Sequence, residues 1–207
     1  MTHSTDKKKE KRDRILQAAT DLFSKKGFAE TTISDVAKAA NVSFGSVFTY
    51  FDTKESLFEA AVTEPFEAIN TLFLHYPFDP KNYLMSLKQM VRAHTVYFAQ
   101  NENVVRLLQQ VLGQYKRFPK LFDILNTFLH DVTTTYGQII LEGQNHGVLY
   151  KRPTESVVIS YLSYLNGIRL TIIDPPDHPI WDELAVQGYY LFGPIQTEEN
   201  KNESELS

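Results

Sequence analysis

The sequence predicts an all-α fold, with a unit of short helices at the N-terminus and a longer helical domain after it. Apolar residues recur at spacings of three and four along most of the 207 residues, which is typical of amphipathic helices. Prolines and glycines fall between these stretches, where helices end. No stretch alternates between apolar and polar residues as a half-buried strand would.

The first helical stretch has one apolar face and ends at a glycine. The apolar face comprises Ile15, Leu16, Ala19, Leu22 and Phe23. Gly27 follows Lys25 and Lys26, whose charges suit the negative end of a helix dipole. We therefore expect Gly27 to form the C-terminal cap of this helix.

A short second helix is predicted from a capping box. Thr32 and Asp35 have the spacing in which each side chain bonds the other residue's backbone N–H. The residues that this helix would bury are Ile33, Val36, Ala37 and Ala40. Asn41 is expected to adopt a left-handed conformation at its end.

Ser43 is expected to cap a third helix that runs to about Phe51 and buries Val47 and Phe48. Asp52 and Thr53 are expected to cap a fourth helix, in which Pro65 predicts a kink or a break. Glu55 has the spacing to close a capping box from Asp52. Helical patterns cover residues 54–75, 81–101, 103–113, 119–146, 154–173 and 179–192.

Charge is distributed unevenly along the chain. Residues 1–54 carry 10 Lys and Arg against 7 Asp and Glu, whereas residues 55–207 carry 11 against 18. The basic excess at the N-terminus comes from Lys7, Lys8, Lys9, Lys11, Arg12 and Arg14. This asymmetry divides the chain into a domain at residues 1–54 with a basic arm, whose charge suits nucleic acid, and a helical domain at residues 55–195. Residues 196–207 are expected to be a disordered acidic tail.

Two short helices joined by a tight turn after a longer helix form a helix-turn-helix, whose second helix enters the major groove. The stretch that would do so offers small or hydrogen-bonding side chains. Phe44 and Thr49 would point away from the core, and Gly45 leaves the backbone accessible. The Ser43 and Ser46 hydroxyls could reach phosphates. Tyr50 suits a phosphate contact or a place in the core, and we favour the contact with DNA.

The run from Thr31 to Leu57, TTISDVAKAANVSFGSVFTYFDTKESL, resembles the helix-turn-helix signature of TetR-type transcriptional repressors. The resemblance covers residues 12–60. It implies DNA-facing positions at Thr32, Ser43, Phe44, Gly45, Ser46, Thr49, Tyr50 and Lys54. Two departures are Phe48, where the family has Tyr, and Ser46, where Thr is commoner. The resemblance also implies that residues 1–54 are a helix-turn-helix DNA-binding domain and that residues 55–195 are an effector-binding and dimerisation domain.

A homodimer is expected from small and apolar residues on the last two helices. Ser160, Ser163 and Gly167 form a seam that permits close approach of another helix. Residues 179–192 carry two apolar stripes, one of which includes Leu184, Gly188 and Leu191. Because two apolar faces need two partners, we favour a second subunit over a helix buried within a monomer.

An effector pocket is expected among aromatic and large apolar residues of the middle helices, with a few polar anchors. Its candidate lining is Phe66, Phe73, Met90, His94, Tyr97, Leu108, Tyr115, Phe122 and Asn166. The composition favours a hydrophobic or aromatic ligand. Each residue taken singly also fits an ordinary core position.

The sequence therefore predicts a ligand-relieved repressor that binds a pseudopalindromic operator in double-stranded DNA as a homodimer. Control by a protein partner and action as an activator remain open. No enzyme, metal or cofactor is expected, because the chain has no cysteine and no HExxH, GxGxxG, GxSxG or Walker pattern. No secretory signal or membrane span is apparent, so we expect a bacterial cytoplasmic protein.

Overall fold

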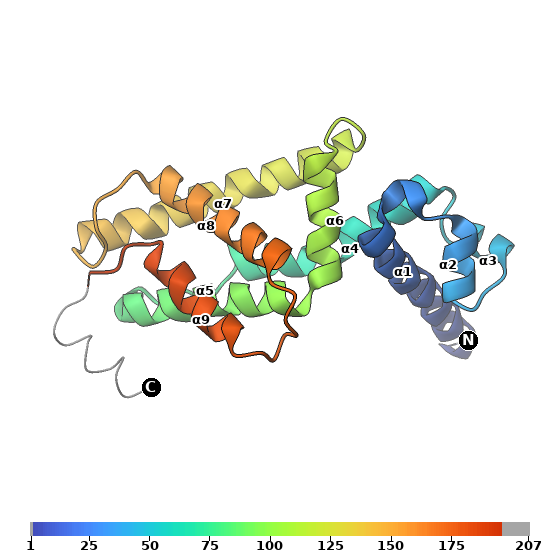
Figure 1. Cartoon of the computed structure of the whole chain (residues 1–207), viewed down its shortest axis with the longest axis horizontal. Coiled ribbons are helices and arrows are strands. Elements are labelled where there is room, and N and C mark those ends of the chain that lie inside the picture. The colour runs from blue at the N-terminus through green and yellow to red at the C-terminus, as the bar shows by residue number, and fades with distance from the viewer. Residues whose placement is uncertain (1, 196–207) are drawn as a thin grey trace. The chain divides into compact units, whose positions relative to one another are not determined.

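The computed structural model describes residues 2–195 and confirms the all-α prediction over that range (Figure 1). The helices are α1 Thr2–Glu30, α2 Ile33–Ala39, α3 Phe44–Phe48, α4 Lys54–Leu74, α5 Tyr83–Gln100, α6 Glu102–Gly113, α7 Pro119–Asn145, α8 Thr154–Thr171 and α9 Ile180–Tyr190, with a 3-10 turn η1 at Pro80–Asn82. Leu149 and Pro194 form an isolated β-bridge. Among the described residues, no helix is long and apolar enough to cross a membrane. The predicted acidic tail at 196–207 lies outside this range.

The chain forms two compact units that are not simple halves of the sequence. Of the described residues, the first unit contains 2–70 together with Asn101–Asn126, and the second contains Thr71–Gln100 and 127–195. Helix α6 and the start of α7 therefore belong with the N-terminal helices. The predicted domains at 1–54 and 55–195 concern function, which this division does not test, so they remain predictions.

Helix α1 is the central element of the first unit. Its Ile15, Ala19 and Phe23 are fully buried, as the apolar stripe predicts. Gly27 has φ 81° and interrupts the helical geometry of α1, which confirms its expected capping position. Helix α6 packs on α1, where the side chain of Gln110 donates a 2.8 Å hydrogen bond to the carbonyl of Phe23.

Helix α4 is capped by Thr53, one of the two capping residues that the sequence predicts, but not through the predicted capping box. The hydroxyl of Thr53 accepts from the backbone N–H of Ser56, and the Ser56 hydroxyl accepts from Thr53 N–H, each at 3.0 Å. This reciprocal pair replaces the expected box between Asp52 and Glu55. The helix continues through Pro65 to Leu74, so of the predicted kink or break, the break does not occur.

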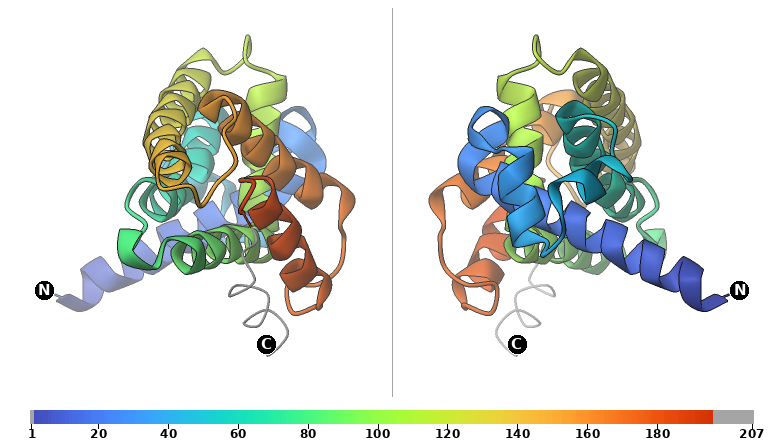
Figure 2. Two further views of the ribbon diagram at one scale, coloured as in Figure 1. Left: turned by 90° about the vertical axis from the view of Figure 1, so that its left-hand side faces the viewer. Right: turned by 90° about the vertical axis from the view of Figure 1, so that its right-hand side faces the viewer.

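In the second unit, α5 lies beside α9, as both Figure 1 and the left view of Figure 2 show. Helix α9 buries Trp181, Ala185 and Gly188. A Cβ at Gly188 would lie 3.1 Å from Cγ1 of Val91 on α5, so glycine permits this close packing. The guanidinium of Arg169 on α8 lies 5.4 Å from the ring centroid of Trp181.

Candidate nucleic-acid interface

Helix α2 begins at the capping box that the sequence predicts. The Thr32 hydroxyl accepts from Asp35 N–H, and the Asp35 carboxylate accepts from Thr32 N–H, each at 3.1 Å. The hydrogen bond from the Thr32 backbone lowers the pKa of Asp35. Val36 and Ala37 face the core of the first unit, so the opposite side of α2 stays exposed.

A tight turn connects α2 to α3. Asn41 has φ 54°, which confirms its expected left-handed conformation, and Ser43 caps α3 by accepting from Ser46 N–H at 3.3 Å. Helix α3 ends at Phe48 rather than near Phe51. The backbone N–H of Phe51 still donates to Val47, and the Phe51 ring is buried, so the chain turns inward here.

Phe48 contradicts the sequence prediction. The sequence predicts it beside Val47 in the core, but its side chain is 40% exposed, whereas Val47 is fully buried. Phe44 is 56% exposed, and the two rings pack edge to face with centroids 5.3 Å apart. The reason is the short length of α3, because a single turn presents one inward position while residues four apart share its outer face.

A chain of polar contacts holds a positive charge beside α3. The ammonium of Lys11 donates to the Ser46 hydroxyl at 3.1 Å, and the Ser46 and Ser43 hydroxyls are 2.7 Å apart. The sequence places Lys11 only within a general basic run and gives no sign of its position relative to α3. A cation held next to hydroxyls is suited to a backbone phosphate.

The other expected DNA-facing residues lie on the same unit with differing exposure. Thr32, Gly45 and Thr49 are exposed, and Tyr50 is half-buried against the core. The Thr49 hydroxyl donates to the carbonyl of Gly45 at 3.3 Å. The Lys54 ammonium donates to the Ala29 carbonyl at 3.3 Å and lies 4.5 Å from the centroid of the Phe28 ring.

Arg12 differs from the rest of the basic run because it is paired. Its guanidinium makes a two-point contact with the Glu64 carboxylate of α4, one arm of which is 3.1 Å long. The hydrogen bond to Glu64 raises the pKa of Arg12. Lys7, Lys8 and Arg14 remain exposed, so they contribute the free positive charge of this end of α1.

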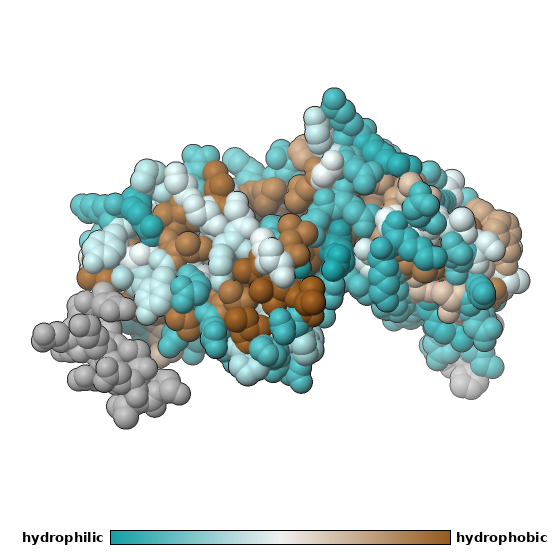
Figure 3. Space-filling model, viewed as in Figure 1, coloured by the Kyte–Doolittle hydropathy of each residue, from teal (hydrophilic) through white to brown (hydrophobic). Residues whose placement is uncertain are grey.

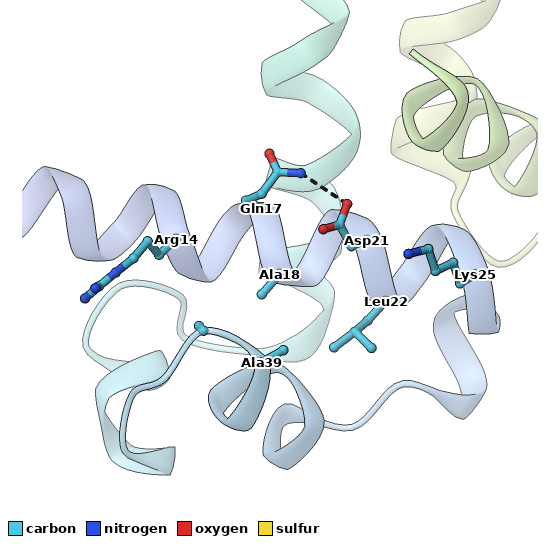
Figure 4. Close-up of a pocket in the computed structure, with 8 residues that line it drawn as sticks. Arg14, Gln17, Ala18, Asp21, Leu22, Lys25 and Ala39 are labelled. Carbon is cyan, nitrogen blue, oxygen red and sulfur yellow. Dashed lines mark hydrogen bonds between the residues drawn. The ribbon is translucent and has the colours of Figure 1, made fainter. Parts of the chain in front are cut away.

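A groove of about 320 Å³ runs between α1 and α2 (Figure 4). Its apolar floor includes Ala18, Leu22 and Ala39, and its α1 rim carries Arg14, Gln17, Asp21 and Lys25. The side chain of Gln17 donates to Asp21 at 3.1 Å. The groove is open to solvent and has opposite charges on its rim, so it gives no preference for one ligand charge.

The residues expected to line the effector pocket are divided between the two units. Phe66, Leu108 and Phe122 pack against the core of the first unit, and Tyr115 is 49% exposed there. The second unit contains Phe73, Met90, His94, Tyr97 and Asn166. Four of the nine residues therefore belong to the first unit and five to the second, and their common pocket stays a prediction.

A buried polar cluster surrounds His94 in the second unit. The ring stacks on Phe73 with centroids 4.0 Å apart. Its Nδ1 is 2.8 Å from the hydroxyl of Tyr161, and its Nε2 is 3.2 Å from that of Tyr136. Burial lowers the pKa of His94 to about 3, so the ring is neutral at ordinary pH.

The expected interface residues divide between the surface and the interior. Ser160 and Ser163 are exposed on α8, and a Cβ at Gly167 would meet no atom within 4 Å. Leu184 and Leu191 are half-buried. Gly188 is a correction, because it is buried against α5 within its own chain and does not face outward.

These elements define a helix-turn-helix protein whose second short helix exposes its outer face. Residues 15–61 match the family model described as bacterial regulatory proteins, tetR family. The biofilm operon negative transcriptional regulator IcaR of Staphylococcus aureus strain Newman is 36% identical over 63 residues, which is 30% of this chain and 34% of IcaR. The uncharacterised HTH-type regulator YerO of Bacillus subtilis is 42% identical over 52 residues, 25% of this chain and 18% of YerO. The matched part thus spans about a third or less of these relatives.

Solved structures extend the likeness to the whole fold. A tetR-family regulatory protein from Rhodococcus RHA1 superposes with TM-score 0.73 at 24% identity and covers 90% of this chain and 98% of its own. PfmR, a TetR-family regulator from Thermus thermophilus, has TM-score 0.71 at 20% identity, covering 89% and 100%. The helix-turn-helix is therefore that of the TetR family, and the chain has the fold of TetR-family regulators.

Proposed function

We propose that this protein is a transcriptional repressor that binds a pseudopalindromic operator as a homodimer. The observation that carries the proposal is the capped helix-turn-helix, in which α3 exposes its outer face next to Lys11, Ser43 and Ser46. Such a helix is placed to enter the major groove while neighbouring polar and basic groups hold phosphates. The relatives are named as transcriptional regulators rather than as enzymes, which supports the proposal that this protein is a regulator too. Since its target would be bacterial DNA, we place the protein in the cytoplasm.

The outer face of α8 and α9 supports the proposed dimer. Apolar side chains are exposed there, including Ile159, Leu170, Val186 and Tyr190, and Leu170 is 64% exposed. Figure 3 shows apolar surface over this part of the second unit. Ser160 lies next to Ile159 on α8 and leaves room for a facing helix. Exposed apolar groups clustered on adjoining helices are typical of a subunit interface.

The cluster around His94 is the basis for proposing a small effector. Uncharged hydrogen-bonding groups of His94, Tyr136 and Tyr161 are buried among aromatic rings. An apolar site with a few fixed polar groups suits a hydrophobic or aromatic molecule. A ligand that binds a conformation with misplaced recognition helices would weaken operator binding by about 5- to 150-fold.

The test begins with duplexes of random sequence, from which the full-length protein selects its preferred site. The proposal predicts an inverted repeat whose half-sites are about 10 base pairs apart, since one dimer presents two recognition helices. Affinity should fall with salt, and Lys54→Gln should flatten the log–log slope by about 0.9 for each phosphate contact removed. Failure to enrich any sequence, or an affinity insensitive to salt, would refute the proposal.

Two further measurements separate the finer parts of the proposal. A reporter gene carrying the selected site should be repressed by the protein, whereas increased expression would make it an activator. Thermal unfolding of the protein with a panel of hydrophobic and aromatic compounds should reveal a ligand that also weakens operator binding. If no compound does so, control by a protein partner replaces the effector.

A further inference from the structure

The outer face of α3 carries two exposed apolar side chains, Phe44 and Phe48. Phe44 and Phe48 are one helical turn apart, and their rings contact each other edge to face. They are among the exposed large hydrophobic residues of the chain. Figure 3 shows apolar surface at the end of the molecule where Figure 1 labels α3.

The hydroxyl groups near these rings already take part in hydrogen bonds within the protein. The Thr49 hydroxyl donates a hydrogen bond to the Gly45 carbonyl. Ser43 and Ser46 share a hydrogen bond, and Ser46 also accepts from Lys11. The side chains of the Phe44–Phe48 pair have no hydrogen-bonding groups, so this accessible part of α3 can recognise bases only by apolar contact.

Thymine is the base that offers an apolar group in the major groove, its 5-methyl, and phenylalanine is among the side chains that contact it. We propose that Phe44 and Phe48 together read thymine 5-methyl groups in each half-site of the operator. The ring of Phe48 thus acts in base recognition, although it lacks the hydroxyl with which a tyrosine there could bond a phosphate. This inference rests on the proposed DNA-binding function.

DNA is the occupant favoured by the surroundings of the pair. Lys11 and the serines flank the rings with groups suited to phosphates, and the exposed Lys7 and Lys8 add positive charge on the same unit. An apolar protein partner would have to desolvate these charges, whereas a duplex neutralises them. If the test below shows that DNA methyl groups do not affect binding, a protein partner becomes the alternative occupant of the Phe44–Phe48 surface.

The experiment compares the selected operator duplex with one in which every thymine is replaced by deoxyuridine. This change removes only the 5-methyl groups and keeps the hydrogen-bonding edges of the bases. The full-length wild-type protein should bind the uracil duplex more weakly, by about fourfold for each contacted methyl, because each corresponds to one buried carbon group. Single replacements would then locate the thymines that matter.

The matched variant is Phe44→Ala combined with Phe48→Ala, and the control is Tyr150→Ala, another exposed aromatic residue outside α3. The double variant should bind both duplexes equally, whereas the control should retain the wild-type difference. Equal affinity of the wild type for both duplexes would overturn the inference while leaving DNA binding intact, which distinguishes it from failure to select any duplex. If the double variant does not fold, equal affinity of the wild type for both duplexes still overturns the inference, and Phe44→Ala and Phe48→Ala tested singly then assign the methyl contacts to each ring.

Discussion

The buried His94 makes the stability of the second unit depend on pH, and His94→Gln should remove most of that dependence. The ring has no exposed surface and is surrounded by neutral groups, with Phe73 stacked on it and the hydroxyls of Tyr136 and Tyr161 at its nitrogens. Burial disfavours the charged form, which lowers the pKa from 6.5 to about 3.

The unfolded chain therefore binds a proton at this residue as the pH falls through 6.5, whereas the folded chain stays neutral until about pH 3. Because the unfolded state binds more protons, the free energy of unfolding decreases as the pH falls across this window. Linkage with these two pKa values gives a loss of about 2 kcal/mol between pH 7 and pH 5. His94→Gln lacks the titrating ring and should not show this loss.

Urea unfolding at a series of pH values measures the effect directly. The chain has a single tryptophan, Trp181, which is buried in the second unit and reports its unfolding by fluorescence. His146→Gln is the matched control, because His146 is exposed in the same unit and is solvated in both states. If wild type and His94→Gln lose equal stability between pH 7 and pH 5, the reasoning about burial is refuted.

Three further substitutions test local features of the fold. Thr32→Ala removes the cap of α2 and should lower the free energy of unfolding by about 0.5–2 kcal/mol in chemical denaturation, whereas Thr32→Ser should preserve it. Gly143→Ala places a Cβ 2.5 Å from the hydroxyl of Tyr83 and should lower the melting temperature, while Gly137→Ala, whose Cβ meets its nearest atom at 3.7 Å, should not. Leu170→Glu puts a charge on the exposed face of α8 and should shift the protein toward monomer in analytical ultracentrifugation; an unchanged dimer would move the interface elsewhere.

Features fixed by neighbouring residues are predictable from the sequence. The capping box at Thr32 and Asp35 and the left-handed Asn41 depend on contacts within a few residues, and the structure has both. For α4 the sequence predicts Asp52 and Thr53 as capping residues but wrongly places the capping box between Asp52 and Glu55, because the spacing suits either residue. The structure uses Thr53 with Ser56.

Features that depend on distant packing are not predictable in this way. The sequence predicts a buried Phe48 because apolar residues usually are buried, but a single turn of helix has room for Val47 alone on its inner face. The helical period shows which face is apolar but not which core that face joins. For this reason residues such as Phe122 and His94, expected in one pocket, belong to separate units.

A hydroxyl-radical footprint of the full-length protein on its selected duplex tests the central claim most directly. The account predicts two protected patches on one face of the DNA, about 10 base pairs apart, because a dimer presents two copies of α3 to successive major grooves. Replacing Ser46 or Tyr50 should weaken both patches together. A single patch, or protection that does not recur at one helical turn, would contradict the account.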